Sequence, residues 1–285
     1  MATSLDFQEY LDRIEKDFFE PIDSYQVIQQ GWTNLVIEIN QQWIFRFVRD
    51  INNQQIAVEQ DFLPKFAPLS PVNIPEIAFG DRDYIAYRKI VGSRFAPEKF
   101  LLLSGNQKTE IIQLLGEFLT CLHNFQFSHQ HLSSAPYGGK NFWNDLWLLV
   151  KNDLSTHTRD KAERYFNDAF KKINTISFNK VLIHADLGTN NVLVNFEQGV
   201  LSGVIDFGDL CLGDPAADFA SFYRNFGRQF TEKLLCYYHR PIEDNFWARI
   251  DYESKRKLFF VVYFALNYGF ESYVPRIIQY IEQLF

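Results

Sequence analysis

The sequence has few cysteines, no excess of positive charge and no long apolar run, and each of these absences excludes a class of protein. Three cysteines in 285 residues, Cys121, Cys211 and Cys236, are too few and odd in number for a disulfide framework. A net charge of −7 argues against general binding to nucleic acid or to an anionic membrane. No uncharged apolar stretch approaches the ~18 residues of a membrane span, and the acidic start lacks the pattern of a secretory signal. We therefore expect a cytoplasmic protein with neither nucleic acid nor membrane as a partner.

Apolar and aromatic residues, by contrast, are plentiful. Hydrophobic residues make up 47% of the chain and aromatic residues 17%, with 29 Phe, 14 Tyr and 5 Trp. A chain of this length and composition can bury a large core, as one domain or as two lobes. The sequence contains no internal repeat and no low-complexity tract.

The hydrophobic pattern changes character near residue 92. Period-two and period-3.6 spacings predict a β-rich first third and a mainly helical remainder, with short strands between the helices. We place the boundary between residues 91 and 92. The predicted helices span 5–20, 53–63 (ending before Pro64), 107–125, 141–150, 159–173, 216–225, 231–238, 254–268 and 274–285, and the predicted strands span 25–28, 35–39, 43–48, 77–79, 84–90, 181–183, 191–195 and 203–206.

Three polar residues are predicted to meet at one end of these short strands. His184-x-Asp186 follows an apolar strand, Asn191 begins the next strand five residues after Asp186, and Asp206-Phe207-Gly208 ends the third. A carboxylate that orients and deprotonates a hydroxyl, together with oxygen ligands for Mg²⁺, is what phosphoryl transfer requires. The spacing therefore points to a phosphotransferase, although either motif alone occurs often by chance.

The segments HADLGTNN, IDFGD and DPAADF resemble the signature of the aminoglycoside phosphotransferase family, a branch of the protein-kinase-like fold. Through INQQWIFRFVRD and Glu59, the chain looks most similar to the aminoglycoside 2″-phosphotransferases. The resemblance spans about residues 25–225. It implies an α+β, two-lobed fold with a nucleotide-binding lobe at 1–91 and a helical lobe at 92–285 for catalysis and acceptor binding.

The resemblance also implies roles for the residues in the second lobe. Asp186 is expected to be the catalytic base, and Asn191 and Asp206 are expected to bind Mg²⁺. His184 is expected to brace the catalytic loop. Asp214 and Asp218, from the family's trailing DPxxD pattern, are expected to hold this loop and the helix that follows, since Asp is favoured as a helix cap.

In the first lobe the chain departs from the family pattern. Arg46 stands where the family has a lysine that contacts the nucleotide phosphates, with Glu59 as its expected partner. Because Phe45 and Phe47 would share one face of the strand, Arg46 should point to the opposite face. Arginine keeps the charge but binds phosphate and carboxylate as a planar fork. Gly31 is the single glycine of the expected phosphate loop. The expected hinge runs through Arg88, Lys89 and Ile90, whose backbone would contact the purine.

The implied reaction transfers the γ-phosphoryl group of ATP or GTP, with Mg²⁺, to a hydroxyl of a small molecule, with an aminoglycoside antibiotic as the expected acceptor. Kinases of macrolides, choline, homoserine or fructosamine are alternatives, and so is a kinase-fold module that binds nucleotide without turnover. Several acids after Asp206 could attract a polycation, whereas interspersed arginines and lysines leave the sign of the pocket open. These acids are Asp209, Asp214, Asp218, Glu232, Glu243 and Asp244. We expect the protein to be a monomer or a weak dimer.

A second group of residues has the side-chain types of a zinc site. Cys121, His123, His129 and His131 lie close together in the sequence. Cys121 and His123 are two residues apart on a predicted helix, so they point to different faces. We therefore favour ordinary histidines at a helix end over a metal site.

Overall fold

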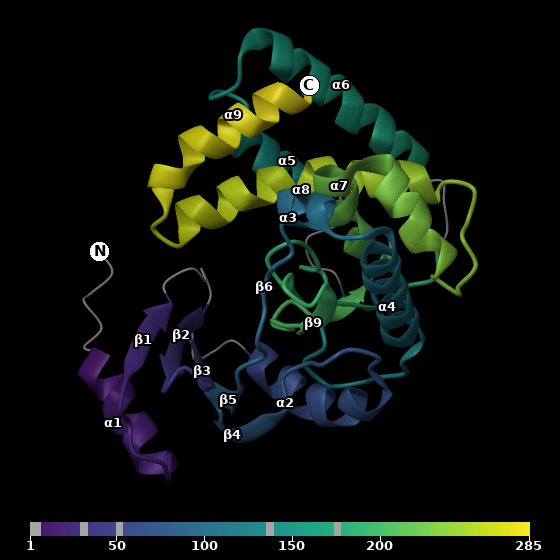
Figure 1. The fold of residues 1–285 in the computed structure, drawn as a ribbon. Coiled ribbons are helices and arrows are strands. Elements are labelled where there is room, and N and C mark those ends of the chain that lie inside the picture. The colour runs from purple at the N-terminus through teal and green to yellow at the C-terminus, as the bar shows by residue number, and fades with distance from the viewer. Residues whose placement is uncertain (1–6, 29–33, 50–53, 135–139, 174–177) are drawn as a thin grey trace.

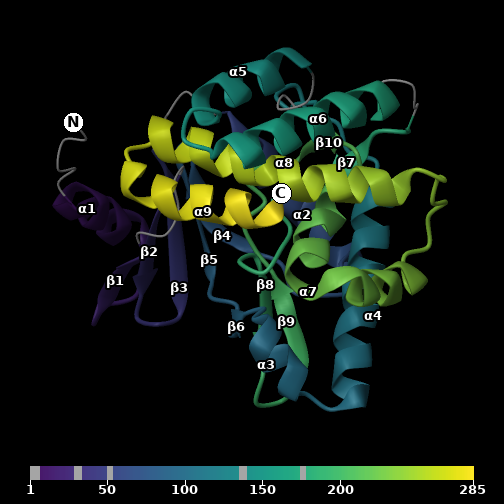
Figure 2. The same cartoon turned by 90° about the horizontal axis from the view of Figure 1, so that it is seen from above.

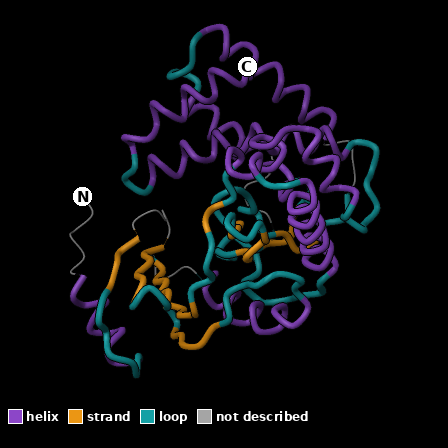
Figure 3. The backbone as a smooth tube through the Cα atoms, viewed as in Figure 1, coloured by secondary structure: helices purple, strands orange, loops and turns teal. Residues whose placement is uncertain are grey.

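The computed structural model describes residues 7–28, 34–49, 54–134, 140–173 and 178–285. It confirms the predicted α+β class: the longer strands gather in the first third of the chain and helices dominate the rest (Figure 3). In Figure 1 the N-terminal sheet lies at the lower left and the C-terminal helices form the upper layer, with the short strands between them.

The N-terminal sheet is antiparallel, with strand order β1-β2-β3-β5-β4. Its members are β1 (Tyr25–Ile28), β2 (Asn34–Ile39), β3 (Trp43–Val48), β4 (Ile77–Asp81) and β5 (Tyr84–Arg88). Helix α1 (Phe7–Asp17) packs on one face of the sheet, and helix α2 (Gln55–Phe66), followed by a short 3₁₀ turn at Ala67–Leu69, packs on the other.

The alternation of side chains along β3 assigns residues to these two faces. Phe45 and Phe47 lie in the cluster under α1 and are almost completely buried, whereas Ile44 belongs to the larger core shared with α2. Arg46 therefore points to the α2 face, as the period of two predicts. This orientation turns the one cation of β3 toward the rest of the molecule.

The middle of the chain carries a long helix and several short strands. Helix α4 (Gly105–Asn124) begins with a capping box, in which the Ser104 side chain accepts from the Gln107 backbone and Gln107 bonds back to the Ser104 N–H. Two small antiparallel sheets lie beside it, in the orders β6-β8-β9 and β10-β7. The remaining elements here are β6 (Ser93–Arg94), α3 (Pro97–Leu102), β7 (Val181–Ile183), β8 (Val192–Asn195), β9 (Val200–Val204) and β10 (Cys211–Gly213).

The C-terminal helices form the upper layer, and Figure 2 shows α8 and α9 running side by side. Trp143, Phe166 and Phe259 pack in a separate aromatic cluster that joins α5, α6 and α8. Within the described residues, no helix combines the length and apolar character needed to cross a membrane. The helices are α5 (Lys140–Val150), α6 (Thr156–Ile173), α7 (Ala217–Cys236), α8 (Phe246–Asn267) and α9 (Val274–Leu284), with a 3₁₀ turn at Glu271–Tyr273.

Several predicted boundaries were wrong, and burial explains two of the differences, at the end of α2 and at the start of α8. Helix α2 continues through Pro64 to Phe66, since a proline so near the end removes one hydrogen bond while Phe66 stacks on Phe62 in the core. The two helices predicted at 216–225 and 231–238 together form α7, and the predicted break between them is present as a non-helical kink at Gly227 (φ 80°). Helix α8 begins at Phe246, eight residues earlier than predicted, because its first turns are buried.

The contact between α4 and α7 yields a stability prediction. A Cβ added at Gly116 would lie 2.7 Å from Tyr237 Cβ and 3.0 Å from the Leu234 carbonyl oxygen, whereas one at Gly105 has nothing within 4 Å. We expect Gly116→Ala to lower the free energy of unfolding by about 1–3 kcal/mol, because overpacking outweighs the better helix propensity of alanine. Gly105→Ala, in the same helix, should be neutral or slightly stabilising. Urea unfolding of both variants checks this, and equal midpoints would contradict it.

Candidate active site

The loop after β7 presents Asp186. Strand β7 ends at Ile183, and Ala185 takes a left-handed conformation (φ 64°) that turns the chain. The backbone N–H of Asp186 donates to His184 Nδ1 at 3.3 Å, and His184 Nε2 bonds to the Ile205 carbonyl oxygen at 3.1 Å. The loop is thereby fixed, while the Asp186 side chain keeps 41% of its surface exposed.

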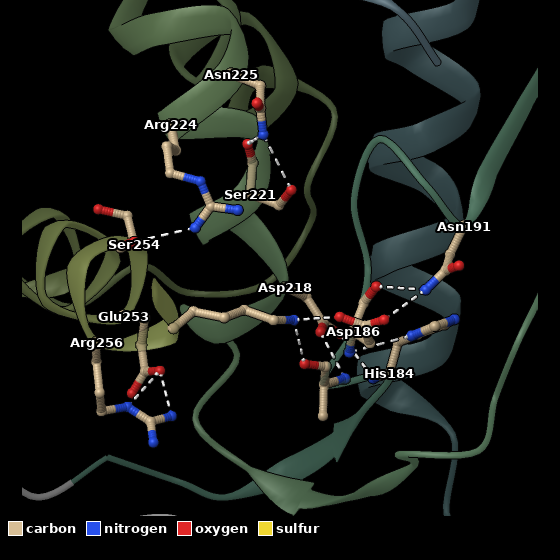
Figure 4. A network of polar contacts seen from close by, with 12 residues as sticks. His184, Asp186, Asn191, Asp218, Ser221, Arg224, Asn225, Glu253, Ser254 and Arg256 are labelled. Carbon is tan, nitrogen blue, oxygen red and sulfur yellow. Dashed lines mark hydrogen bonds and ion pairs between the residues drawn. The ribbon is translucent and has the colours of Figure 1, made fainter. Parts of the chain in front are cut away.

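Both oxygens of the Asp186 carboxylate have partners (Figure 4). The Asn191 amide nitrogen donates to Oδ2 at 2.8 Å and to the Asp186 carbonyl at 2.9 Å. The Lys257 ammonium, from α8, donates to Oδ1 at 2.5 Å. Burial would raise the pKa of Asp186, but Lys257, His184 and Asn191 together lower it. The carboxylate is therefore ionised and oriented.

Beneath this loop lies the fully buried carboxylate of Asp218, in the first turn of α7. It accepts from the backbone N–H groups of His184 (2.8 Å) and Ala185 (2.9 Å), and it lies 3.2 Å from His123 Nε2 of α4. Burial would raise the pKa of Asp218, but His123 and the loop donors lower it overall. His123 also contacts the Tyr238 hydroxyl at 2.7 Å, so this histidine is a partner of the loop support.

Asp214 sits at the junction between β10 and α7. One carboxylate oxygen accepts from the Ala216 backbone N–H at 2.9 Å, and the other is 2.8 Å from Arg249 Nε. Burial raises the pKa of Asp214 to about 6, against the effect of the Ala216 and Arg249 contacts. The structure thus places Asp214 and Asp218 on either side of the start of α7.

Asp206 follows β9, which ends at Val204 rather than at Asp206 as predicted. Its φ of 65° marks a turn, and its side chain is 43% exposed. The Ile205 N–H donates to the Asn191 carbonyl at 2.9 Å, so the segments that carry Asn191 and Asp206 are joined directly. The antiparallel pairing of β8 with β9 therefore brings the two expected metal ligands to one edge.

The donor atoms at this edge suit Mg²⁺. Asn191 uses its amide nitrogen for Asp186, which leaves the amide oxygen, and Asp206 offers a carboxylate; Mg²⁺ prefers such oxygens and draws further ligands from phosphates. Asp209 is exposed, yet desolvation of its carboxylate and the nearby Asp186 and Asp206 charges raise its pKa, a sign of concentrated negative charge. In the described part of the chain, no three His, Cys, Asp or Glu side chains form a metal cluster by themselves.

Arg46 and Glu59 form the predicted ion pair, buried between β3 and α2. Arg46 also lies 3.6 Å from Asp206 Oδ1. Burial would lower the pKa of Arg46, but Glu59 and Asp206 raise it; burial also raises the pKa of Glu59 to about 7. Glu59 Oε1 has no hydrogen-bond partner among the described residues. A Cβ on Gly208 would come within 3.2 Å of both Arg46 Nη1 and Glu59 Oε1, so the turn after Asp206 packs directly on this pair.

The other residues predicted to bind nucleotide are placed less directly. The Arg88 side chain turns toward the α1 side, where it contacts Glu20 at 3.0 Å and lies over the Trp43 ring. Only the backbone of Arg88 is thus left for a purine. Ile90 lies near Gly203 of β9. Gly31 lies outside the described residues.

The acids expected to line the acceptor pocket are mostly engaged with other side chains. Glu243 shares Arg249 with Asp214, and Glu232 pairs with Arg228 at 2.8 Å. Asp218, as described above, is fully buried.

Basic residues instead lie on the α7 and α8 side of Asp186 (Figure 4). Arg224 of α7 donates to the Ser254 carbonyl at 3.1 Å, and burial lowers its pKa while Asp186 opposes this shift. Arg256 pairs with Glu253 at 2.6 Å.

Arg224 is one of the interspersed basic residues that left the sign of the acceptor pocket open, whereas sequence reasoning missed Lys257 and the contact of His123 with Asp218. Lys257 is 71 residues from Asp186, and His123 is 95 residues from Asp218. Neither Lys257 nor His123 belongs to a phosphotransferase motif, and their helices show only ordinary amphipathic spacing. No local signal could have found them.

Comparison with known proteins places these features in a family. The phosphotransferase enzyme family matches residues 24–249. Viomycin phosphotransferase of Streptomyces vinaceus is 30% identical over 111 residues, which cover 36% of this chain and 37% of that protein. The uncharacterized protein YcbJ of Bacillus subtilis is 33% identical over 69 residues, or 24% of this chain and 22% of that protein. The chain thus aligns with well under half the length of these curated relatives.

Solved structures share the fold over nearly the whole chain. The GDP and kanamycin complex of an aminoglycoside 2″-phosphotransferase has a TM-score of 0.81 at 22% identity, covering 97% of this chain and 98% of that one. Macrolide 2′-phosphotransferase type I has a TM-score of 0.72 at 18% identity, covering 98% of each chain. The fold is therefore the kinase-like fold that the motifs predicted. Since the family match extends over most of the sequence, the chain belongs to the phosphotransferase enzyme family.

Proposed function

We propose that this protein transfers the γ-phosphoryl group of ATP or GTP to a hydroxyl of a small molecule, with Asp186 as the base. The observation that carries the proposal is the accessible Asp186 carboxylate, fixed by Asn191 on the same edge as Asp206. An acceptor hydroxyl that donates to this carboxylate would lose its proton as its oxygen attacks the γ-phosphorus. The nucleotide assignment is supported by relatives whose structures hold GDP or ADP.

Arg46 would bind the phosphates, and Asn191 and Asp206 would hold Mg²⁺. When bound, the metal would neutralise charge on the phosphates. The buried Arg46–Glu59 pair keeps the guanidinium in place beside Asp206. His184, Asp214 and Asp218 would act only on the loop geometry, since their polar atoms are bound to backbone or to other side chains.

Aminoglycosides are the first acceptor class, on the likeness to the kanamycin complex. A macrolide is the second candidate. The observation that favours it is the position of Arg224 and Lys257, two cations on the side of Asp186 that the acceptor would face, where a polycation would be repelled. The macrolide phosphotransferase structure shares the fold. A panel of aminoglycosides and macrolides with both nucleotides separates the two.

The role of Arg46 is tested by its removal. Arg46→Ala should weaken nucleotide binding by about 1.5–3 kcal/mol, the usual range for a hydrogen bond to a charged group, and Arg46→Lys should keep most activity. Because Arg46→Ala leaves Glu59 buried and unpaired, the double variant Arg46→Met with Glu59→Gln serves as the control: it should restore stability but not nucleotide affinity. Calorimetric titration with ADP gives the affinities, and wild-type affinity in the double variant would show that Arg46 is only structural.

The metal assignment is tested with Asp206. Asp206→Ala should weaken nucleotide binding in the presence of Mg²⁺, and the difference from wild type should disappear in excess chelator, because both proteins then lack the metal. Calorimetry with and without EDTA measures both effects. Wild-type protein that binds nucleotide equally well in chelator would refute a metal held by Asp206.

The central prediction concerns Asp186. Asp186→Asn is nearly isosteric, so the fold and the ADP affinity should persist while kcat falls by about 10²–10⁴-fold. Asp168→Asn, an exposed carboxylate on α6, is the matched control and should resemble wild type. A coupled kinase assay on the best acceptor of the panel measures kcat. An Asp186→Asn enzyme with wild-type kcat would refute the role of Asp186, and a wild type that phosphorylates no acceptor would favour a nucleotide-binding module without turnover.

A further inference from the structure

Lys257 of α8 reaches the loop that presents Asp186. Its ammonium donates to Asp186 Oδ1 at 2.5 Å and to the Ala185 carbonyl oxygen at 3.0 Å. Asn191 occupies the other carboxylate oxygen, on the edge shared with Asp206. Lys257 and the expected metal ligands thus lie on opposite sides of the same carboxylate.

Among the residues that the structure describes, these two contacts leave one donor of Lys257 unused. A protonated lysine has three N–H donors, and the two interactions given above account for two of them. The Lys257 side chain is 28% exposed and the Asp186 side chain 41%, so a bound substrate can reach their contact. The third N–H is therefore available to a ligand that approaches Asp186.

The proposed reaction brings an anion to this place. A hydroxyl hydrogen-bonded to Asp186 that attacks the γ-phosphorus places the phosphoryl oxygens within a few ångströms of the carboxylate. Cations beside these oxygens stabilise the charge of the transition state. Arg46 lies on the N-terminal sheet side, beside Asp206, so it does not occupy the α8 side of the site. Lys257 does.

We propose that Lys257 is a further catalytic residue, whose ammonium holds Asp186 in the free enzyme and donates a hydrogen bond from its third N–H to an oxygen of the transferred phosphoryl group. This inference rests on the proposed phosphotransferase function. In the step, the acceptor O–H bond breaks and its proton goes to Asp186. The bond from the acceptor oxygen to phosphorus forms, and the bond from phosphorus to the oxygen of the leaving diphosphate breaks. Lys257 remains protonated throughout.

The alternative is that Lys257 only clamps the loop, and two substitutions separate these roles. Lys257→Gln keeps a neutral donor that can bond to Asp186 or to the Ala185 carbonyl, and Lys257→Arg keeps the charge. If Lys257 only clamps the loop, Lys257→Gln should keep its function. If Lys257 binds the phosphoryl group, Lys257→Arg should keep its function and Lys257→Gln should not. Lys255→Met is the matched control, because Lys255 lies on the same helix and pairs with Asp251, away from Asp186.

The experiment measures the affinities for Mg·ADP and for the non-hydrolysable β,γ-imido analogue of ATP by calorimetry, and kcat with the best acceptor. We expect Lys257→Gln to bind the imido triphosphate about 10- to 100-fold more weakly while its ADP affinity stays within about threefold. Its kcat should fall by about 10²–10³-fold. Lys257→Arg should recover most of both quantities, and Lys255→Met should match wild type.

Two results would overturn the proposal. Lys257→Gln with a wild-type ratio of the two affinities would show that Lys257 does not contact the γ-phosphoryl group, and an equal loss for both nucleotides, with a lowered melting temperature, would show a clamp. The affinity ratio judges Lys257 without turnover. A wild type that binds both nucleotides but phosphorylates no acceptor would therefore count against the proposed function alone.

Discussion

The geometry of the site depends on one buried carboxylate, that of Asp218. It receives the His184 and Ala185 backbone N–H groups and contacts His123, so one side chain joins the end of β7, helix α4 and the start of α7. A buried charge that loses its partners costs several kcal/mol, so these three elements are held together. Asp186 follows one residue after the last of these anchored N–H groups. The position of Asp186 is therefore set by Asp218, which is buried and supports the loop, whereas the Asp186 carboxylate is partly exposed at the site.

A second buried charge pair joins the N-terminal sheet to the same strands. Arg46 and Glu59 bridge β3 and α2, and Arg46 also lies beside Asp206. Phe207, the next residue, packs against Phe62 of α2 and Phe118 of α4. An arginine at this position suits the arrangement, because its planar fork can face a carboxylate on each side, which a single ammonium does less well. The arginine that replaces the usual lysine is therefore matched by two carboxylates, those of Glu59 and Asp206.

Charges counted along the sequence misrepresent those that a substrate would meet. Asp214 and Glu243 both neutralise Arg249, which is almost completely buried, so these acids belong to the internal structure of the helical region. The cations near Asp186, Arg224 and Lys257, come from helices whose charges look ordinary in the sequence. Membership of the family supports the proposed phosphoryl transfer, and in this proposal the side chains on α7 and α8 would select the acceptor.

The sequence by itself determined the features that depend on short-range geometry. The period of two along β3 separated Arg46 from Phe45 and Phe47, and the five-residue spacing put Asn191 within reach of Asp186. Tertiary structure decided the rest. Burial of Phe66 carried α2 past Pro64, and burial of its first turns moved the start of α8 to Phe246. Lys257 met Asp186, and His123 met Asp218, across 71 and 95 residues. Such pairs leave no periodic trace in the sequence, because only the packing of whole helices brings their side chains together.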